Sequence, residues 1–346
     1  MAPRAVCLFK VNYLGDAIAF LPTVRGVRDA FPAASVVVVC SAATADLYLG
    51  TFRGLRVVTV PRESANGVRA LAQLPRLWAK LGFRGRDVAL LSNDEPALAV
   101  LGALFGAARR IGFDLTSSRL RWALSDVLPI GRGRNIVDLN FDLVRRLTGN
   151  DALMPKRTPV GFAPTDRAVV DEKLGALGLE RSEPFVLIHP FGKKRYQMWG
   201  LENYRALEKA IGASGMKCVF ISGGEREKVD NARVASGLKI AQLASLCARA
   251  RLFVGSNSGP MHLAAAMGTP TLAVQGATAR EWDIFWDDVP HNHIVATQIP
   301  CVPCERFGAV TMECTNHASP MACMKAISVE QVYAEVKAQL DSGRPG

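Results

Sequence analysis

Short runs of β-branched and other apolar residues recur along the whole chain, with stretches of helical periodicity between them. The expected strands are 6–11, 35–40, 56–60, 87–92, 109–113, 184–189, 217–222, 251–255 and 271–276. The expected helices are 16–30, 66–82, 95–106, 166–178, 201–214, 225–236, 240–249, 260–267 and 328–341. Strands that are apolar on both faces and alternate with helices are typical of parallel sheets covered on both sides. The chain is therefore predicted to be an α/β protein.

One break in this alternation divides the chain. Residues 149–165 are rich in proline and polar residues and lack periodicity, which is typical of a linker. At roughly 100–200 residues per domain, a length of 346 residues also suggests two domains. We therefore predict two Rossmann-like domains, residues 1–157 and 158–346, whose parallel sheets face a central cleft.

The N-terminal stretch does not have the pattern of a secretory signal, because Lys10 and Asp16 interrupt its apolar run. The longest apolar stretch, residues 97–108, is interrupted by glycine and is shorter than the roughly 20 residues that span a membrane. We therefore expect a soluble, cytoplasmic protein. In that compartment eight cysteines indicate buried thiols, metal ligands or catalysis rather than disulfides.

Positive charge is concentrated in the first half. Residues 1–157 carry 22 basic and 12 acidic side chains, a net charge of +10, and residues 158–346 carry 20 and 19, a net charge of +1. Such an excess attracts anionic partners: nucleic acid, an acidic membrane surface or a phosphorylated substrate. It can also serve solubility alone. Nucleic acid is the weakest of these interpretations, because the sequence contains no recognisable nucleic-acid-binding module. The expected helix 66–82 is either an ordinary surface helix or a basic helix at a lipid interface.

The segment VNYLGDA (11–17) is the first candidate site. A strand ends here, Gly15 permits a tight turn, and Asp16 opens the next helix. Ligands of open α/β sheets bind at the carboxyl ends of strands, where a carboxylate can act as a general base on a hydroxyl group. Asp16 can equally be a helix cap. The dinucleotide fingerprint GxGxxG is absent from this loop.

The segment VGSNSGPMHLAAAMGTPTLAVQG (254–276) is the strongest candidate. A strand ends at Gly255, and the turn Asn257-Ser258-Gly259 leads through Pro260 into a short helix. Free backbone N–H groups and the helix dipole favour a phosphate or pyrophosphate at such a point. The hydroxyl of Ser258 adds a hydrogen-bond donor. His262 lies on the first turn, where it is either a structural hydrogen-bonding residue or takes part in the chemistry.

Two further strand ends carry charged residues. After strand 184–189 the chain contains Lys193, Lys194 and Arg195, which can neutralise a diphosphate leaving group or form a solvated loop. After strand 217–222 two glycines precede Glu225, and a carboxylate placed there commonly accepts hydrogen bonds from ribose hydroxyls.

Four of the eight cysteines lie within residues 301–323. Cys301 and Cys304 form a CxxC pair, and Cys314 and Cys323 follow. Four thiolates can hold a structural Zn or Fe ion, with His317 as an alternative ligand. The other interpretation is four reduced thiols. The sequence has no Asp-x-Asp, Walker or GxSxG motif, so a Mg-bridged nucleotide-sugar site of the usual kind is not expected.

Taken together, residues 8–32 and 256–274, the HPFG and WGLENY elements and the Cys-rich tail resemble glycosyltransferase family 9, the lipopolysaccharide heptosyltransferases. The resemblance covers nearly the whole chain. It implies a GT-B architecture with an acceptor-binding N-terminal domain and a C-terminal domain for a nucleotide sugar, normally ADP-heptose. It also implies an inverting reaction without a catalytic metal. Asp16 then matches the general base, Ser258 and Gly259 match diphosphate contacts, and Glu225 matches a ribose-binding carboxylate.

Three positions depart from the family pattern. Asn257 stands where the family usually has Asp, Gln197 stands where it has Lys, and QGAT (275–278) replaces Phe-Gly-Pro-Thr. Lys193, Lys194 or Arg195 can replace the missing lysine charge from a shifted position. These departures affect the donor assignment more than the fold, and they allow a different nucleotide sugar or reduced activity.

We therefore expect a metal-independent glycosyltransferase that moves a heptose or related sugar from an ADP-sugar to a lipopolysaccharide core or other lipid-linked anionic glycan. The basic first half would dock that acceptor at the acidic inner face of the inner membrane, and no nucleic acid is expected as a partner. Two alternatives stay open: a nucleotide-sugar epimerase on the same scaffold, and a non-catalytic protein that binds nucleotide sugar or glycan.

Overall fold

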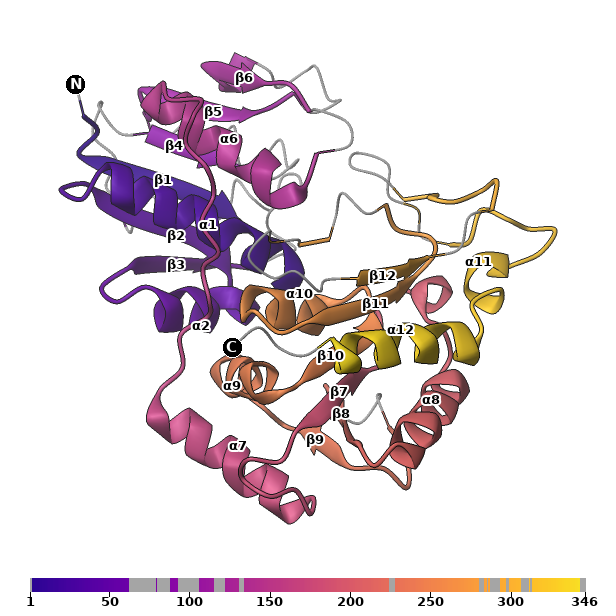
Figure 1. The fold of residues 1–346 in the computed structure, drawn as a ribbon. Helices are drawn as coiled ribbons and strands as arrows, with labels where there is room; N and C mark the ends of the chain where they lie inside the picture. The colour runs from indigo at the N-terminus through magenta and orange to yellow at the C-terminus, as the bar shows by residue number, and fades with distance from the viewer. Residues whose placement is uncertain are drawn as a thin grey trace. The chain divides into compact units, whose positions relative to one another are not determined.

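The computed structural model describes residues 2–61, 79, 88–92, 106–114, 122–130, 134–223, 228–279, 283–284, 286, 293–296, 299–305, 311 and 313–342. Contacts within the chain divide it into two compact units, Met1–Thr158 and Pro159–Gly346. Figure 1 shows unit 1 in indigo to magenta and unit 2 in rose to yellow. The predicted boundary lies between residues 157 and 158.

Unit 1 is built on a parallel sheet in the order β3-β2-β1-β4-β5-β6. Its strands are β1 (Ala5–Lys10), β2 (Ser35–Ser41), β3 (Arg56–Val60), β4 (Val88–Leu91), β5 (Arg109–Phe113) and β6 (Asp126–Leu128). The run of four valines in β2 is buried throughout, as expected of a strand covered on both faces. This strand order is that of the Rossmann fold.

The described helices of unit 1 are α1 (Leu14–Ala30), α2 (Ala42–Thr51) and α6 (Ile136–Thr148). Helices α1 and α6 pack closely because residue 26 is glycine, where a Cβ atom would lie 2.6 Å from the ring of Phe141. Helix α6 begins with Asn135, whose side chain accepts a hydrogen bond from the Val137 N–H, and ends at Gly149, which has a φ angle of 71°. Predicted helices 66–82 and 95–106 fall, except for residues 79 and 106, outside the described residues.

Unit 2 contains a second parallel sheet, in the order β12-β11-β10-β7-β8-β9. Its strands are β7 (Phe185–His189), β8 (Lys217–Ser222), β9 (Val234–Ser236), β10 (Leu252–Ser256), β11 (Thr271–Gln275) and β12 (His293–Ala296). Numbered within the unit and read from the β9 edge, this is the order of unit 1. The prediction of two Rossmann-like parallel sheets is confirmed. In each unit the strand order reverses once, between β1 and β4 and between β7 and β10.

The described α-helices of unit 2 are α7 (Pro164–Ala176), α8 (Leu201–Ala213), α9 (Ile240–Arg249), α10 (Gly259–Ala266), α11 (Ala322–Lys325) and α12 (Val329–Asp341). Helix α12 lies beside α8, and α7 lies beside α9 (Figure 1). Trp199 joins α12 to the loop before α8, because it is buried and its indole N–H donates a hydrogen bond of 2.8 Å to the Ile327 carbonyl. No helix in the described ranges is long and apolar enough to cross a membrane.

The prediction of a helix over 225–236 is wrong at its carboxyl end. Residues 234–236 form the edge strand β9, which pairs with β8. Asn231 (φ 53°) and Gly237 (φ 69°) have left-handed backbone conformations that break a helix on either side of β9. The sequence analysis did not include helices α2 and α6 or strands β6 and β12. The two strands lie at sheet edges and are three and four residues long, which is too short a pattern to detect.

Candidate functional site

The carboxyl ends of β7 and β10 meet at the reversal point of the second sheet, where open α/β sheets bind their ligands. His189 ends β7, Ser256 ends β10, and Ser258 is the N-cap of α10. Residue 255 must be small there, because a Cβ atom on Gly255 would lie 2.5 Å from the His189 carbonyl oxygen. The two strand ends therefore come together because glycine permits the close approach.

Serine hydroxyls join these strand ends. The hydroxyl of Ser258 lies 3.0 Å from Nδ1 of His189. The hydroxyl of Ser256 donates a 3.2 Å hydrogen bond to the Pro190 carbonyl and lies 3.2 Å from the hydroxyl of Tyr204. Tyr204 is fully buried, and burial is the main cause that raises the pKa of its hydroxyl well above 10. The hydrogen bonds of this network hold the loop after β10 in place.

The amino end of α10 points its first N–H groups out of the helix. Ser258 has an extended backbone and its side chain makes no capping hydrogen bond, because its hydroxyl is directed to His189. Asn257, Ser258 and Gly259 are half-exposed, whereas His262 is only 7% exposed. The three turn residues are therefore accessible to an anion at a helix N-terminus, and His262 belongs mainly to the protein interior.

Asn257 lies in a closed polar triangle with Gln275 and Asp283. Its amide donates hydrogen bonds to the Gln275 side-chain oxygen at 3.0 Å and to the Asp283 carboxylate. The Gln275 amide in turn donates to the same carboxylate at 2.8 Å. Asp283 is 2% exposed. A carboxylate is thus present at this strand edge, on residue 283 rather than on residue 257.

The three predicted cations after β7 have different environments. Lys193 and Arg195 are exposed. Lys194 is buried and forms an ion pair with Glu305, and its ammonium group also donates to the Thr311 carbonyl at 2.5 Å. Its charge is therefore already compensated within the protein, which argues against Lys194 as the cation that contacts a diphosphate. Glu225 lies outside the described residues.

The Cys-rich tail brings its thiols into one region. Cys323 is buried, while Cys301, Cys304 and Cys314 are half-buried. Burial raises the pKa of the Cys323 thiol, and the three other thiols add to that rise, so all four lie within electrostatic range. Sγ of Cys314 accepts a hydrogen bond from the Met321 N–H at 3.3 Å. Over the ranges that the structure describes, no group of three or more His, Cys, Asp or Glu side chains has the arrangement of a metal site. His317 is exposed.

In unit 1, Asp16 lies in the first turn of α1, directly after β1, and is half-buried. The N-cap residue of α1 is Tyr13, so Asp16 is not the cap itself. The carboxylate of Asp16 makes no hydrogen bond or ion pair with the part of the chain that the structure describes. Next to it, the reversal point is closed by buried Lys10, which donates a 3.0 Å hydrogen bond to Ser92. Ser92 in turn donates to Asn140 of α6.

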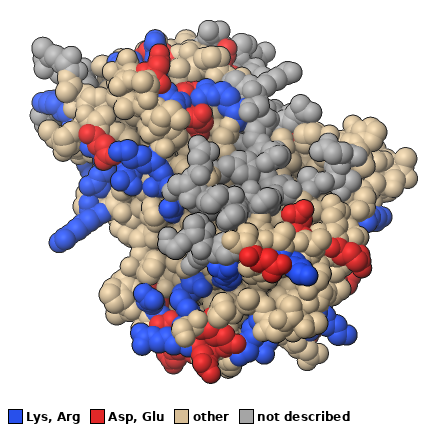
Figure 2. Space-filling model, viewed as in Figure 1, with Lys and Arg blue, Asp and Glu red and all other residues tan. Residues whose placement is uncertain are grey.

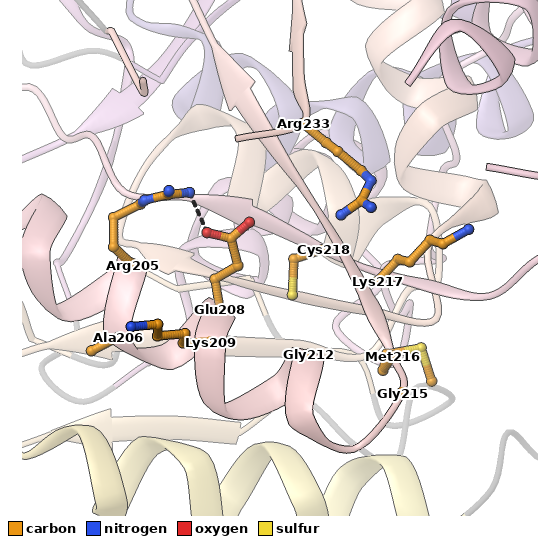
Figure 3. Close-up of a pocket in the computed structure, with 10 residues that line it drawn as sticks. All are labelled: Arg205, Ala206, Glu208, Lys209, Gly212, Gly215, Met216, Lys217, Cys218 and Arg233. Carbon is orange, nitrogen blue, oxygen red and sulfur yellow. Dashed lines mark hydrogen bonds and ion pairs between the residues drawn. The ribbon is translucent and has the colours of Figure 1, made fainter. Parts of the chain in front are cut away.

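A cavity of about 690 Å³ lies elsewhere in unit 2, where α8 ends and β8 begins (Figure 3). Arg205 and Glu208 form an ion pair within it. Lys217 pairs with Glu183, and Arg233 donates to the Leu177 carbonyl. This cavity is at the amino end of β8, opposite to the strand ends described above, and most of its cations already have protein partners.

Sequence reasoning missed Lys10, Asp283 and Glu305. Glu305 directly follows the CxxC pair in the sequence, but no residue near it in the sequence indicates that its side chain contacts Lys194. Asp283 belongs to no motif. Lys10 was noted only as an interruption of the apolar stretch.

Residues 74–310 match glycosyltransferase family 9 (heptosyltransferase). The chain is 23% identical over 300 residues to lipopolysaccharide heptosyltransferase 3 of Escherichia coli, covering 82% of this chain and 86% of that protein. The glycosyltransferase family 9 protein of Veillonella parvula has the same fold, with a TM-score of 0.78, 16% identity and 98% of both chains covered.

Two other solved structures share this fold. One is the E. coli heptosyltransferase WaaC with ADP-2-deoxy-2-fluoro heptose, with a TM-score of 0.70, 15% identity and coverage of 96% of this chain and 99% of that chain. The other is the iron-containing dodecameric glycosyltransferase TibC from enterotoxigenic E. coli, with a TM-score of 0.59, 12% identity and coverage of 98% of this chain and 77% of that chain.

The two Rossmann-like sheets and these likenesses define a GT-B fold. The chain belongs to glycosyltransferase family 9, the heptosyltransferase family, and is a glycosyltransferase.

Proposed function

We propose that this enzyme transfers a heptose or related sugar from an ADP-sugar to a lipopolysaccharide core or another lipid-linked anionic glycan. The observation that carries the proposal is the half-exposed turn Asn257-Ser258-Gly259 at the amino end of α10, at the reversal point of the second sheet. Support for the donor comes from WaaC, whose structure contains an ADP-heptose analogue and has the same fold.

Unit 2 would bind the donor. The N–H groups of the first turn of α10 and the positive end of its dipole would hold the diphosphate. Gly259 would let the backbone approach it, and the Ser258 hydroxyl, oriented by His189, would be a further hydrogen-bonding group. Exposed Lys193 and Arg195 would neutralise the charge that develops on the leaving group, in place of the lysine that Gln197 replaces.

Unit 1 would bind the acceptor and supply the base. The carboxylate of Asp16 would take the proton of the acceptor hydroxyl as that oxygen attacks the anomeric carbon. The new glycosidic bond would form on the side opposite to the breaking bond, so the configuration would invert and the nucleoside diphosphate would leave with the electron pair. Asp16 suits this role because, among the described residues, no cation or hydrogen-bond donor occupies its carboxylate. The reaction as proposed needs no catalytic metal.

The four tail cysteines would hold a structural Zn or Fe ion. The three other tail thiols each raise the pKa of the Cys323 thiol, although the described residues do not show a completed ligand arrangement. Four thiolates suit either ion, and TibC, which shares the fold, contains iron. Metal analysis of the purified protein tests this: about one ion per chain is expected, and four freely titratable tail thiols without metal would contradict it.

The basic first half would contact an acidic membrane surface. Figure 2 shows basic side chains with acidic ones among them on both units, and the net charge is +10 for residues 1–157 and +1 for residues 158–346. Arg4, Arg53 and Arg56 are exposed and form no ion pair with other described residues. The protein should bind vesicles that contain acidic lipid, and lose that binding as salt is added, but should not be retained on DNA.

The decisive experiment compares ADP-, UDP- and GDP-linked sugars by thermal shift and then measures transfer to a lipid-linked core. Stabilisation by the ADP-sugar alone, with product formed only when acceptor is present, is expected. Conversion of the donor without acceptor would identify an epimerase. Binding without any turnover would contradict the proposed reaction.

A further inference from the structure

Glu305 is the centre of a buried polar cluster in unit 2. Its carboxylate accepts hydrogen bonds from three side chains of one loop: the Lys194 ammonium, the Tyr196 hydroxyl at 2.5 Å and the Gln197 amide. Glu305 is 5% exposed and Lys194 is 9% exposed. A buried carboxylate is retained at such a point only when charge and hydrogen bonds compensate it, and here one loop supplies all three donors.

The loop that Glu305 holds is the one that borders the proposed diphosphate site. Gly192 lies against Ser256, since a Cβ atom at residue 192 would be 3.9 Å from the Cβ atom of Ser256. The Gln197 amide also donates to the Thr278 hydroxyl at 3.2 Å, just beyond β11. These contacts hold residues 192–198 between the ends of β10 and β11. They therefore also determine where the exposed Lys193 and Arg195 lie.

The cysteine-rich tail is attached to the same edge at two other points. The backbone of Glu305 pairs with the segment after β11, because its N–H donates to the Ala277 carbonyl at 3.0 Å and its carbonyl accepts from Ala279 at 3.1 Å. Cys323 lies against Gly276, where a Cβ atom would be 2.7 Å from the Cβ atom of Cys323. Glu305 directly follows Cys304, so the tail and the loop meet at one residue.

We propose that Glu305 is a positioning residue for donor binding. It holds the loop 192–198 in the conformation that presents Lys193 and Arg195 to the nucleoside diphosphate, and it thereby makes donor binding depend on the cysteine-rich tail. The link to the donor rests on the proposed function, whereas the effect of Glu305 on the loop does not.

Two measurements on Glu305→Gln test the proposal. This variant keeps the shape of the side chain but removes the charge and leaves a donor facing Lys194 and Gln197. Hydrogen exchange of the amides at 193–198 should become about tenfold faster than in the parent enzyme, with α7 unchanged as an internal reference. The KM for ADP-heptose should rise and kcat should fall, so that kcat/KM drops about ten- to 100-fold, because Lys193 and Arg195 would contact the diphosphate both before and during its departure and misplacing such a group by about 1 Å can cost that much.

Glu183→Gln is the matched control. Glu183 is also paired with a lysine of unit 2, at 2.7 Å from Lys217, but this pair lies at the amino ends of β7 and β8. The Glu183→Gln variant should change neither the hydrogen exchange of the amides at 193–198 nor the KM for ADP-heptose. If Glu305→Gln does not fold, Lys194→Met/Glu305→Gln removes both buried charges and is measured in the same way.

Unchanged exchange at 193–198 in the folded Glu305 variant would overturn the proposal, whatever the ligand. Faster exchange with an unchanged KM would overturn its link to the donor. If the parent enzyme does not bind ADP or ADP-heptose, the proposed function fails, and the exchange measurement still decides whether Glu305 positions the loop.

Discussion

The reversal points of the two sheets are bridged in the same way but differ in what surrounds the bridge. In unit 1 the bridge is the 3.0 Å hydrogen bond from Lys10 to Ser92, which is buried. In unit 2 it is the 3.0 Å hydrogen bond between His189 and Ser258, and Ser258 is half-exposed at the amino end of α10. The hydrogen bond between Lys10 and Ser92 therefore lies in the interior and stabilises the carboxyl edge of the first sheet, while Ser258 of the second bridge is accessible to solvent.

The difference separates two tasks. Beside the first bridge, Asp16 carries a carboxylate that no described residue engages, which suits a group that exchanges a proton with a substrate. Beside the second bridge, polar side chains form hydrogen bonds with Asp283 and Glu305. Such an arrangement suits an anion-binding site that is preorganised before the ligand binds. Among the described residues, the same fold thus presents an unengaged carboxylate in unit 1 and a hydrogen-bonded polar edge in unit 2.

The largest expected effect comes from Asp16→Asn. The amide keeps the size of the side chain but cannot accept the acceptor proton, so kcat should fall about 100- to 10,000-fold. The Kd for ADP, measured by calorimetry, should stay within about twofold because unit 2 is the unit proposed to bind the donor. Turnover close to that of the parent enzyme would contradict the assignment of the base.

Adding a second carboxylate to the triangle of Asn257, Gln275 and Asp283 should have the next largest effect, this time on stability. Asn257→Asp places a second carboxylate against Asp283 and should lower the free energy of unfolding by about 1–3 kcal/mol at pH 7. Asn257→Asp/Asp283→Asn restores one carboxylate and one amide, and should recover most of the stability in chemical denaturation.

Removing each bridging hydroxyl separately compares the two units directly. Ser92→Ala should lower the free energy of unfolding by about 1 kcal/mol and leave the Kd for ADP unchanged, because it breaks an internal chain. Ser258→Ala should instead weaken ADP binding by about five- to tenfold with little change in stability. Equal effects of the two variants on ADP binding would remove the distinction between the units.

The smallest difference in free energy concerns the thiols, but thiol labelling should still separate the cysteines of the strands from those of the tail by their rates of reaction. Burial raises the pKa of Cys40 to about 11 and that of Cys218 to about 12, so about one part in 1000 or less is thiolate at pH 8. Half-buried Cys301 and Cys314 should react first with iodoacetamide in metal-free protein, as peptide mapping would show. Labelling of Cys40 should accelerate as the pH rises toward 11. Early labelling of Cys218 at pH 8 would contradict the burial described for β8.

Much of the fold and part of the candidate site were predictable from the chain itself. Runs such as Val36–Val39 are buried on both faces and need a covered parallel sheet, and the residues that follow such strands must lie at its carboxyl edge. That rule alone places Asp16 and residues 257–259 at strand ends. It could not show that Lys194 is buried, because a basic triplet in a loop has the same local pattern whether it is solvated or paired.

The sequence by itself determined the alternation of strands and helices, the two sheets and the turns that end β1 and β10, because these depend on side chains that are neighbours along the chain. Only the tertiary structure decided the partners: Lys194 with Glu305 is a contact across 111 positions, and Ser92 with Asn140 spans 48. Such pairs form because the packed core brings distant strand ends together and a buried polar group must find a partner there. The tertiary structure therefore decides which of the charged residues in the sequence remain available to a substrate.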